Sequence, residues 1–159
     1  EGSNILINLR GPGHLCGSMG LYIDNVHHLT VQALTDVKIC LISAKDIEHV
    51  LEKSKEMAIE LIKLKNKSII GLTHKLANLT YKSMAGRVAD VLLYLQKDVY
   101  KSESFTLNLS RQDLADLAAM TKESFIRTLK ELKDSDVIKV SRNQVQIINL
   151  SALIKISNS

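Results

Sequence analysis

The sequence contains no tryptophan, one proline and two cysteines, and aromatic side chains make up only 4% of its 159 residues. So few aromatic rings leave little to stack on the bases of single-stranded nucleic acid. No apolar run approaches the roughly 20 residues that cross a bilayer, so we expect no membrane partner. Cys16 and Cys40 form no C-x-x-C motif, and these two residues alone cannot build a zinc or iron–sulfur site. We therefore predict no metal site.

What is present is typical of a globular protein, with 45% apolar and 24% charged residues. The net charge of +4 suits an anionic partner without proving one. The charge is distributed unevenly. Residues 1–44 carry two basic and three acidic side chains, whereas residues 45–159 carry 19 basic and 14 acidic side chains. The chain begins at Glu1 without a signal-like segment, so we expect a fragment of a cytoplasmic protein with reduced cysteines.

The first 45 residues are predicted to be rich in β-structure. They hold five of the seven glycines and the only proline. Residues 5–9, 26–33 and 37–42 have the apolar and β-branched composition of short strands. Three such strands do not close a sheet with its own core, so this part is predicted to be an incomplete sheet.

A long helix is predicted over residues 46–80, with Ser43 as the cap before it. Two apolar stripes follow its length, and we expect one to face its own domain and the other a second subunit. The alternative is a helix buried within its own domain. The second stripe contains Ile59, Ile62, Ile69 and Ile70, whereas the stripe assigned to dimerisation contains Leu61, Leu64, Ser68, Leu72, Leu76 and Leu79.

The C-terminal part follows the pattern of a winged helix-turn-helix. A helix over residues 83–96 and a loop over 98–104 precede a strand at 105–109. Ser110 then begins one helix with a capping box, the chain turns at Ala119, and Thr121 caps a second helix. Residues 137–148 form a hairpin, with Asn143 expected to take positive φ. If Ala119 must adopt positive φ, the cost is about 1 kcal/mol.

In this motif the second helix enters the DNA major groove, with its N-terminal residues at base edges. We expect base contacts from Lys122, Glu123 and Arg127, because Arg suits guanine and Glu suits cytosine. Phosphate contacts are expected from Ser110, Arg111, Thr121, Ser124, Lys130 and Arg142. The alternative for Glu123 and Arg127, four residues apart, is a solvated ion pair worth about 0.3–0.5 kcal/mol.

These motifs resemble the Crp/Fnr family of bacterial transcription regulators over nearly the whole chain. Residues 109–115 and 121–127 look like the family's DNA-binding signature, in which a Glu precedes an Arg by four positions. The resemblance implies an α+β fold with three parts: the end of a cyclic-nucleotide-binding β-roll (residues 1–45), a dimerisation helix (46–80) and a winged helix-turn-helix (81–159). It also implies a homodimer on pseudo-palindromic double-stranded DNA, with RNA polymerase as a partner.

The effector site implied by the resemblance departs from the nucleotide-binding members. They carry a Gly-Glu pair for the ribose and an Arg for the cyclic phosphate, where this chain has Gly17-Ser18 and only His27 and His28. The predicted pocket contains Gly17, Ser18, Met19, Gly20, His27, His28, Leu72 and Thr73. The effector is therefore unknown. Haem is one option, with His14, His27, His28, Met19 and Cys16 as candidate ligands, although ordinary surface side chains are the favoured interpretation.

The sequence thus predicts a homodimeric, sequence-specific DNA-binding regulator controlled by a signal other than cyclic AMP. The alternative is a small-molecule-binding regulatory module that acts through protein partners. An enzyme using Cys16 and a histidine is disfavoured because no third orienting group or oxyanion motif accompanies them, so no catalytic residue is predicted.

The missing carboxylate and guanidinium predict that titration with cyclic AMP gives no saturable heat at micromolar nucleotide. An arginine–phosphate contact is charge-assisted and strong, so its loss weakens binding steeply. Isothermal calorimetry on the chain measures this, and a micromolar dissociation constant would contradict it.

Overall fold

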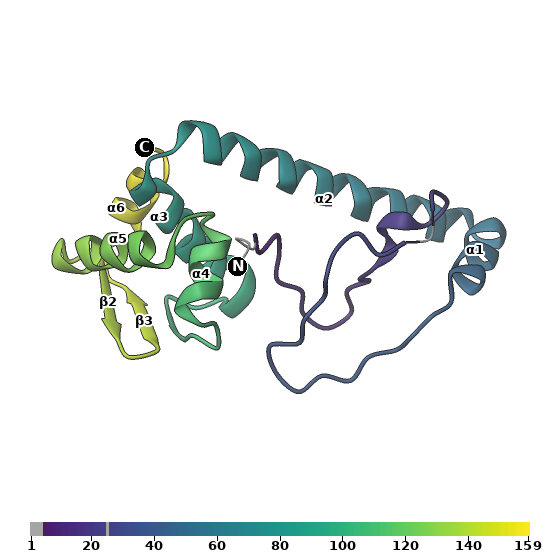
Figure 1. The fold of residues 1–159 in the computed structure, drawn as a ribbon, viewed down its shortest axis with the longest axis horizontal. Coiled ribbons are helices and arrows are strands. Elements are labelled where there is room, and N and C mark those ends of the chain that lie inside the picture. Colours follow the sequence, from purple (N-terminus) through teal and green to yellow (C-terminus); the bar gives the residue numbers. More distant parts are fainter. Residues whose placement is uncertain (1–4, 25) are drawn as a thin grey trace. The chain divides into compact units, whose positions relative to one another are not determined.

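The computed structural model describes residues 5–24 and 26–159 (Figure 1). The chain divides into two compact units, of which one comprises residues 12–73 and the other residues 1–11 with 74–159. The predicted ranges ended at residues 45 and 80, whereas the division falls within helix α2 (Lys55–Tyr81), which both units share. Among the described residues, no helix is both long and apolar enough to cross a bilayer.

The strands predicted before residue 44 are not formed in the described residues. Residues 5–9, 26–33 and 37–42 are irregular, and the regular element there is the short 3₁₀ helix η1 (Ser18–Gly20). A strand is held by hydrogen bonds to a neighbouring strand, and here none is paired. The apolar side chains consequently stay in solvent, with Ile39 75% and Leu41 89% exposed. The prediction of strands at these residues was wrong.

The long helix predicted over residues 46–80 is two helices. Helix α1 (Ala44–Lys53) is capped by Ser43 as expected, because the Ser43 hydroxyl accepts a hydrogen bond from the Asp46 amide at 3.1 Å. The helix stops at Ser54, which has extended backbone angles. The Ser54 hydroxyl accepts from the Met57 amide at 3.2 Å and so starts α2. Serine competes for backbone hydrogen bonds, which favours such a cap over a helix interior.

The second unit contains the winged helix-turn-helix. Its helices are α3 (Met84–Tyr94), α4 (Arg111–Leu117), α5 (Lys122–Asp134) and α6 (Leu150–Ser157). Its strands are β1 (Ser104–Thr106), β2 (Ile138–Ser141) and β3 (Gln144–Ile147), in the antiparallel order β1-β3-β2. The α+β class is therefore confirmed, and β1 is shorter than predicted.

The core of this unit forms where α3, α5 and the sheet meet, around fully buried Leu92, Leu114, Phe125, Ile138 and Val145. The loop predicted at residues 98–104 is partly wrong, because α3 continues as a π-helical turn, η2 (Leu95–Tyr100). The Tyr100 ring stacks on the Phe105 ring at 4.8 Å and ties this turn to β1.

Helix α6 was not predicted, and it packs against α3. Gly86 of α3 allows the C-terminal end of the chain to approach closely. A Cβ at this position would lie 2.6 Å from the Ser159 carbonyl oxygen and 3.2 Å from that of Ile156. Leu153 is fully buried in the resulting contact.

We predict that Gly86→Ala lowers the free energy of unfolding by about 1–3 kcal/mol, because the added methyl group meets backbone atoms that must shift. Gly71→Ala is the matched control. A Cβ at Gly71 meets no atom within 4 Å, so alanine should raise stability by about 0.5–1 kcal/mol through helix propensity. Urea unfolding measures both, and equal effects would contradict the packing argument.

Candidate nucleic-acid interface

Helix α4 begins with the capping box that the sequence predicted. The Ser110 hydroxyl accepts from the Asp113 amide at 3.1 Å, and the Asp113 carboxylate accepts from the Ser110 amide at 2.8 Å. Two backbone donors at the helix start are thereby satisfied. Ser110 remains exposed, so its hydroxyl lies at the surface beside the N-terminus of α4.

The turn between α4 and α5 has the strained residue that the sequence suggested. Ala119 has φ 49°, a left-handed conformation that a Cβ disfavours. Two interactions hold the turn: the Met120 amide donates to the Ala115 carbonyl at 3.1 Å, and the Arg87 guanidinium donates to the Ala119 carbonyl at 3.0 Å. The orientation of α5 relative to α4 therefore depends partly on α3, which carries Arg87.

Helix α5 has one buried face and one exposed face. Thr121 caps its N-terminus by accepting from the Ser124 amide at 3.2 Å, and the Thr121 hydroxyl donates to the Ser124 hydroxyl. Phe125, Leu129 and Leu132 face the core together with Thr128. The opposite face leaves the predicted base-contact residues in solvent, which are Lys122, Glu123 and Arg127.

The alternative ion pair between Glu123 and Arg127 is not formed. The ion pairs among the described residues join His28 with Asp24, Lys63 with Glu60, and Lys82 with Asp90. No side-chain hydrogen bond of Lys122, Glu123 or Arg127 occurs in this part of the chain either. These three side chains keep their donors and acceptors available to a ligand.

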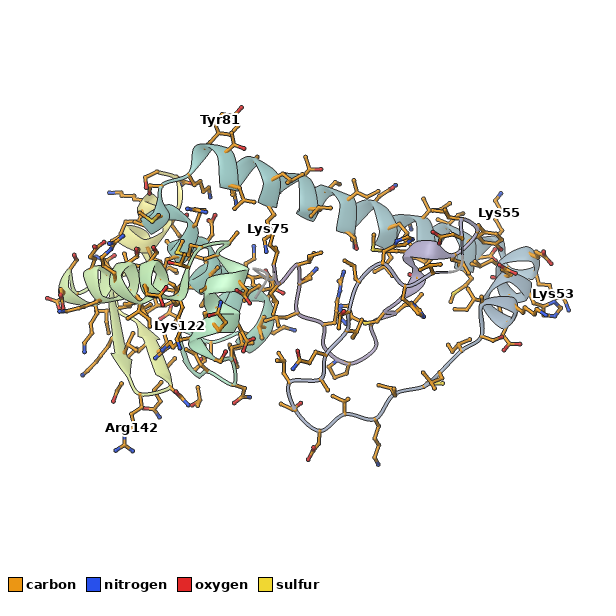
Figure 2. All side chains as sticks on the ribbon, in the orientation of Figure 1. Lys53, Lys55, Lys75, Tyr81, Lys122 and Arg142 are labelled. Carbon is orange, nitrogen blue, oxygen red and sulfur yellow. The ribbon has the colours of Figure 1, made fainter. Side chains whose placement is uncertain are left out.

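The wing is the β2–β3 hairpin, and its tip carries Arg142 (Figure 2). The positive φ was predicted at Asn143 but falls on Arg142, at 51°. Pairing of Ser141 with Gln144 leaves two turn residues, of which Arg142 is the first. The Arg111 guanidinium donates to the Arg142 carbonyl at 2.7 Å, so α4 holds the wing in place.

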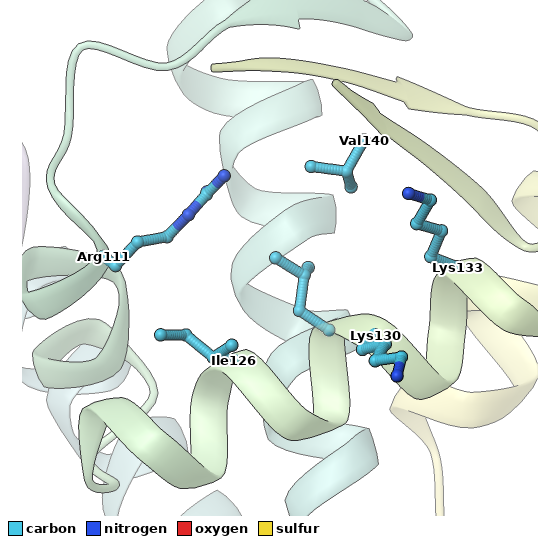
Figure 3. Close-up of a pocket in the computed structure, with 6 residues that line it drawn as sticks. Arg111, Ile126, Lys130, Lys133 and Val140 are labelled. Carbon is cyan, nitrogen blue, oxygen red and sulfur yellow. The ribbon is translucent and has the colours of Figure 1, made fainter. Parts of the chain in front are cut away.

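An open groove of about 210 Å³ lies between α5 and the wing (Figure 3). Arg111, Lys130 and Lys133 supply three cations, and Ile126, Leu129 and Val140 supply an apolar surface. Ile126 and Lys133 were missed in the sequence. Their spacing with Lys130, three or four residues apart along α5, was a signal that places all three on one side of the helix.

Comparison with known proteins agrees with this geometry. A model of the Crp-like helix-turn-helix domain matches residues 86–156. The chain is 28% identical over 149 residues to the probable transcriptional regulator flp of Lacticaseibacillus casei, covering 94% of this chain and 68% of that protein. A Crp-like helix-turn-helix domain therefore lies over residues 86–156, and the curated relatives and the solved structures indicate a regulator of the Crp/Fnr type.

Two further relatives are more distant. The cAMP-activated global transcriptional regulator CRP of Salmonella typhimurium is 22% identical over 142 residues, which are 87% of this chain and 68% of that protein. The structure of FixK2 from Bradyrhizobium japonicum superposes with a TM-score of 0.69 at 19% identity and covers 74% of this chain. The chain spans 60% of that structure, and the likeness shows the fold.

The structure brings the predicted effector residues together only in part. A Cβ on Gly17 would lie 2.8 Å from the His27 ring, so these two residues are neighbours. Ser18 and Met19 begin η1, Gly20 ends it in a buried position, and the Ser18 carbonyl accepts from the Lys65 ammonium. Thr73 donates its hydroxyl to the Ile69 carbonyl at 2.9 Å within α2. Leu72 is 44% exposed.

The titration of this region follows from its contacts. The Val26 amide, which donates to the Asp24 carboxylate, and the adjacent His28 ring lower the pKa of Asp24. Burial lowers the pKa of Lys65. The Nε2 atom of His28 is thus hydrogen-bonded to the Asp24 carboxylate at 2.9 Å. Among the described residues, no group of three or more His, Cys, Asp or Glu side chains could hold a metal ion.

We predict that Ala119→Gly raises the free energy of unfolding by about 1 kcal/mol, because glycine takes positive φ without the Cβ clash. The matched control is the neighbouring Ala118→Gly. Ala118 has φ −81° and is buried, so glycine there should destabilise by about 0.5–1 kcal/mol. Thermal unfolding of both variants distinguishes them. A loss of stability in Ala119→Gly would contradict strain at this turn.

Proposed function

We propose that this chain is part of a homodimeric, sequence-specific DNA-binding transcription regulator. The observation that carries the proposal is the exposed N-terminal face of α5. Lys122, Glu123 and Arg127 lie there in solvent with no ion pair or side-chain hydrogen bond among the described residues. A helix-turn-helix places this part of its second helix at base edges in the major groove.

The three side chains supply the chemistry for reading bases. The Arg127 guanidinium can donate two hydrogen bonds to O6 and N7 of one guanine, and the Glu123 carboxylate can accept from N4 of cytosine. Lys122 can reach a base or a phosphate. Each good bidentate contact discriminates by about 1–3 kcal/mol against the wrong base.

The surrounding groups are suited to the phosphates, which position the protein without reading sequence. Ser110 and Thr121 lie at helix starts, where the helix dipole also favours an anion. Ser124 follows Thr121 in the first turn of α5. Arg142 at the wing tip and Lys130 in the groove add positive charge, and Arg111 fixes the wing while contributing its own.

Dimerisation along α2 places two copies of α5 on the same side of one duplex. Two half-sites about 34 Å apart would then be bound, so the operator should be a pseudo-palindrome. The predicted leucine stripe is mixed in the structure: Leu61, Leu64, Ser68 and Leu79 are half-buried, whereas Leu72 and Leu76 are exposed. RNA polymerase is the protein partner that family membership suggests.

Signal transfer is proposed to run through the junction between α2 and α3. Lys82 donates to both carboxylate oxygens of Asp90 at 2.8 and 2.7 Å, and Asn78 donates to the same carboxylate at 2.9 Å. This half-buried cluster fixes the end of α2 against α3. An effector that favours one arrangement of the junction would change the position of α5 and hence the affinity for DNA.

The effector is proposed to differ from the cyclic AMP of the Salmonella relative. Ser18, at the position of the family's ribose-binding Glu, uses its carbonyl to accept from Lys65. His27 packs against Gly17, and His28 is paired with Asp24. None of these residues supplies the fixed positive charge of an arginine to a cyclic phosphate.

We predict that Arg127→Ala weakens binding to the cognate site by about 1–3 kcal/mol and relaxes the preference at one guanine per half-site. The matched variant Lys130→Ala removes a cation from the same helix. It should weaken cognate and random DNA alike and reduce the slope of log K against log salt by about 1. Gel shifts over a salt series measure both effects.

Equal losses on cognate and random DNA for Arg127→Ala would contradict direct reading of bases. If the unmodified chain showed no salt-sensitive, sequence-selective binding to genomic fragments, the alternative of a module acting through protein partners would replace this proposal.

A further inference from the structure

The turn between α4 and α5 is held by a side chain of α3. The Nη1 atom of Arg87 donates to the carbonyl oxygen of Ala119 at 3.0 Å and to that of Ala118 at 3.5 Å. Ala118 caps the end of α4, and Ala119 carries the strained positive φ. Positive charge beside the last carbonyls of a helix is favourable, because those oxygens form the negative end of the helix dipole. Arg87 thus stabilises both the end of α4 and the turn before α5.

The turn uses only part of the Arg87 guanidinium. A guanidinium has several N–H donors, and both bonds to the turn come from Nη1. The Nε atom is buried and has no hydrogen-bond partner among the described residues. A buried donor without a partner raises the free energy of the folded chain, because its hydrogen bonds to water are lost and none replaces them. Arg87 therefore gains stability from a further acceptor that comes within its reach.

Asp90 supplies the carboxylate of α3, three residues after Arg87. Side chains three residues apart are neighbours on the surface of a helix, and opposite charges at this spacing can pair. A guanidinium and a carboxylate form two parallel, charge-assisted hydrogen bonds, which are stronger than bonds to neutral carbonyls. Yet Arg87 forms no ion pair in the part of the chain that the structure describes. Another group must therefore hold Asp90.

Asp90 is bound by the end of α2. The Lys82 ammonium donates to both carboxylate oxygens at 2.8 and 2.7 Å, and the Asn78 amide donates to one of them at 2.9 Å. The side chains of Lys82 and Asp90 are only 20% and 27% exposed, so salt screens this pair less than a surface pair. Asn78 lies in the last turn of α2, and Lys82 directly follows the helix. The position of this end of α2 therefore determines whether Lys82 reaches Asp90.

We propose that Arg87 is a positioning residue for α5, and that Lys82 keeps Arg87 on the turn by binding Asp90. When the end of α2 moves and Lys82 leaves Asp90, the carboxylate pairs with Arg87 instead. Arg87 then leaves the Ala119 carbonyl, and the turn that sets the direction of α5 loses this bond. The effect on DNA affinity rests on the proposed function, whereas the exchange of partners at Asp90 does not.

Amide hydrogen exchange in the full chain tests the exchange of partners. The Met120 amide, which is bonded within the turn, reports opening of the turn, and the amide of buried Leu92 in α3 reports global unfolding. K82M removes the ammonium and so frees Asp90, and R87M removes the guanidinium. In both variants Met120 should exchange about tenfold faster relative to Leu92, as expected for the loss of one hydrogen bond from a charged donor. The matched variants D90N and K82M/D90N offer Arg87 no charged acceptor, so Met120 should exchange as in the unmodified chain.

Three results would overturn the inference. Equal acceleration at Met120 in K82M and K82M/D90N would show that Asp90 does not draw Arg87 away. A change at Met120 no larger than the change at Leu92 would show that Lys82 acts only on global stability. The third result comes from a double-mutant cycle: if K82M accelerated Met120 as much in the R87M background as in the unmodified chain, Arg87 would not carry the effect. If R87M does not fold, the comparison of K82M with K82M/D90N decides the question alone.

DNA binding is measured separately, by gel shift with a duplex that the unmodified chain selects from a randomised library. K82M should bind this duplex about tenfold more weakly, and K82M/D90N should bind it as the unmodified chain does. If K82M opened the turn at Met120 but kept full affinity, the positioning role of Arg87 would be overturned. If the unmodified chain selected no duplex, the proposed function would fail, while the exchange rates at Met120 would still decide which cation Asp90 binds.

Discussion

The burial of Phe125 is the interaction on which the rest of the site depends. Phe125 is fully buried, and Leu129 and Leu132 follow it along the same face of α5. Because this face is fixed in the core, Lys122, Glu123 and Arg127 remain in solvent on the exposed part of the helix. Two arginines hold the elements beside α5 in place. Arg87 bonds to the turn before α5, and Arg111 bonds to the wing beside it. The packing of the core therefore determines which side chains of α5 face the solvent.

Much of the winged helix-turn-helix could be predicted from the sequence, because its caps and apolar spacings depend on residues close together in the chain. The capping box of Ser110 and Asp113, the cap at Thr121 and the spacing of apolar residues in α5 each depend on neighbours within four positions. For Ala119 the sequence predicted only the cost that a positive φ would carry, and the structure shows φ 49° there. In the hairpin, residue preference predicted the positive φ at Asn143. The pairing of Ser141 with Gln144 instead leaves Arg142 as the first turn residue, and Arg142 has the positive φ. Strand register is a tertiary property and is not carried by residue preference.

The N-terminal residues show why other predictions failed. Residues 26–33 and 37–42 have strand-like composition, but a strand forms only where another strand pairs with it. Helix α6 was missed for the opposite reason, since its eight residues give a short pattern and its stability comes from packing on α3 at Gly86. On α2, the sequence showed both apolar stripes, and the structure leaves members of both exposed, Ile62 and Ile69 of one and Leu72 and Leu76 of the other.

The central claim is that α5 reads a DNA sequence from two copies of the chain at once. Selection of bound duplexes from a randomised library, followed by sequencing, tests it most directly. The account predicts enrichment of inverted half-sites, each with a guanine for Arg127, whose centres lie about one helical turn apart. Recovery of duplexes with no common sequence, or of single half-sites without a symmetric partner, would contradict it.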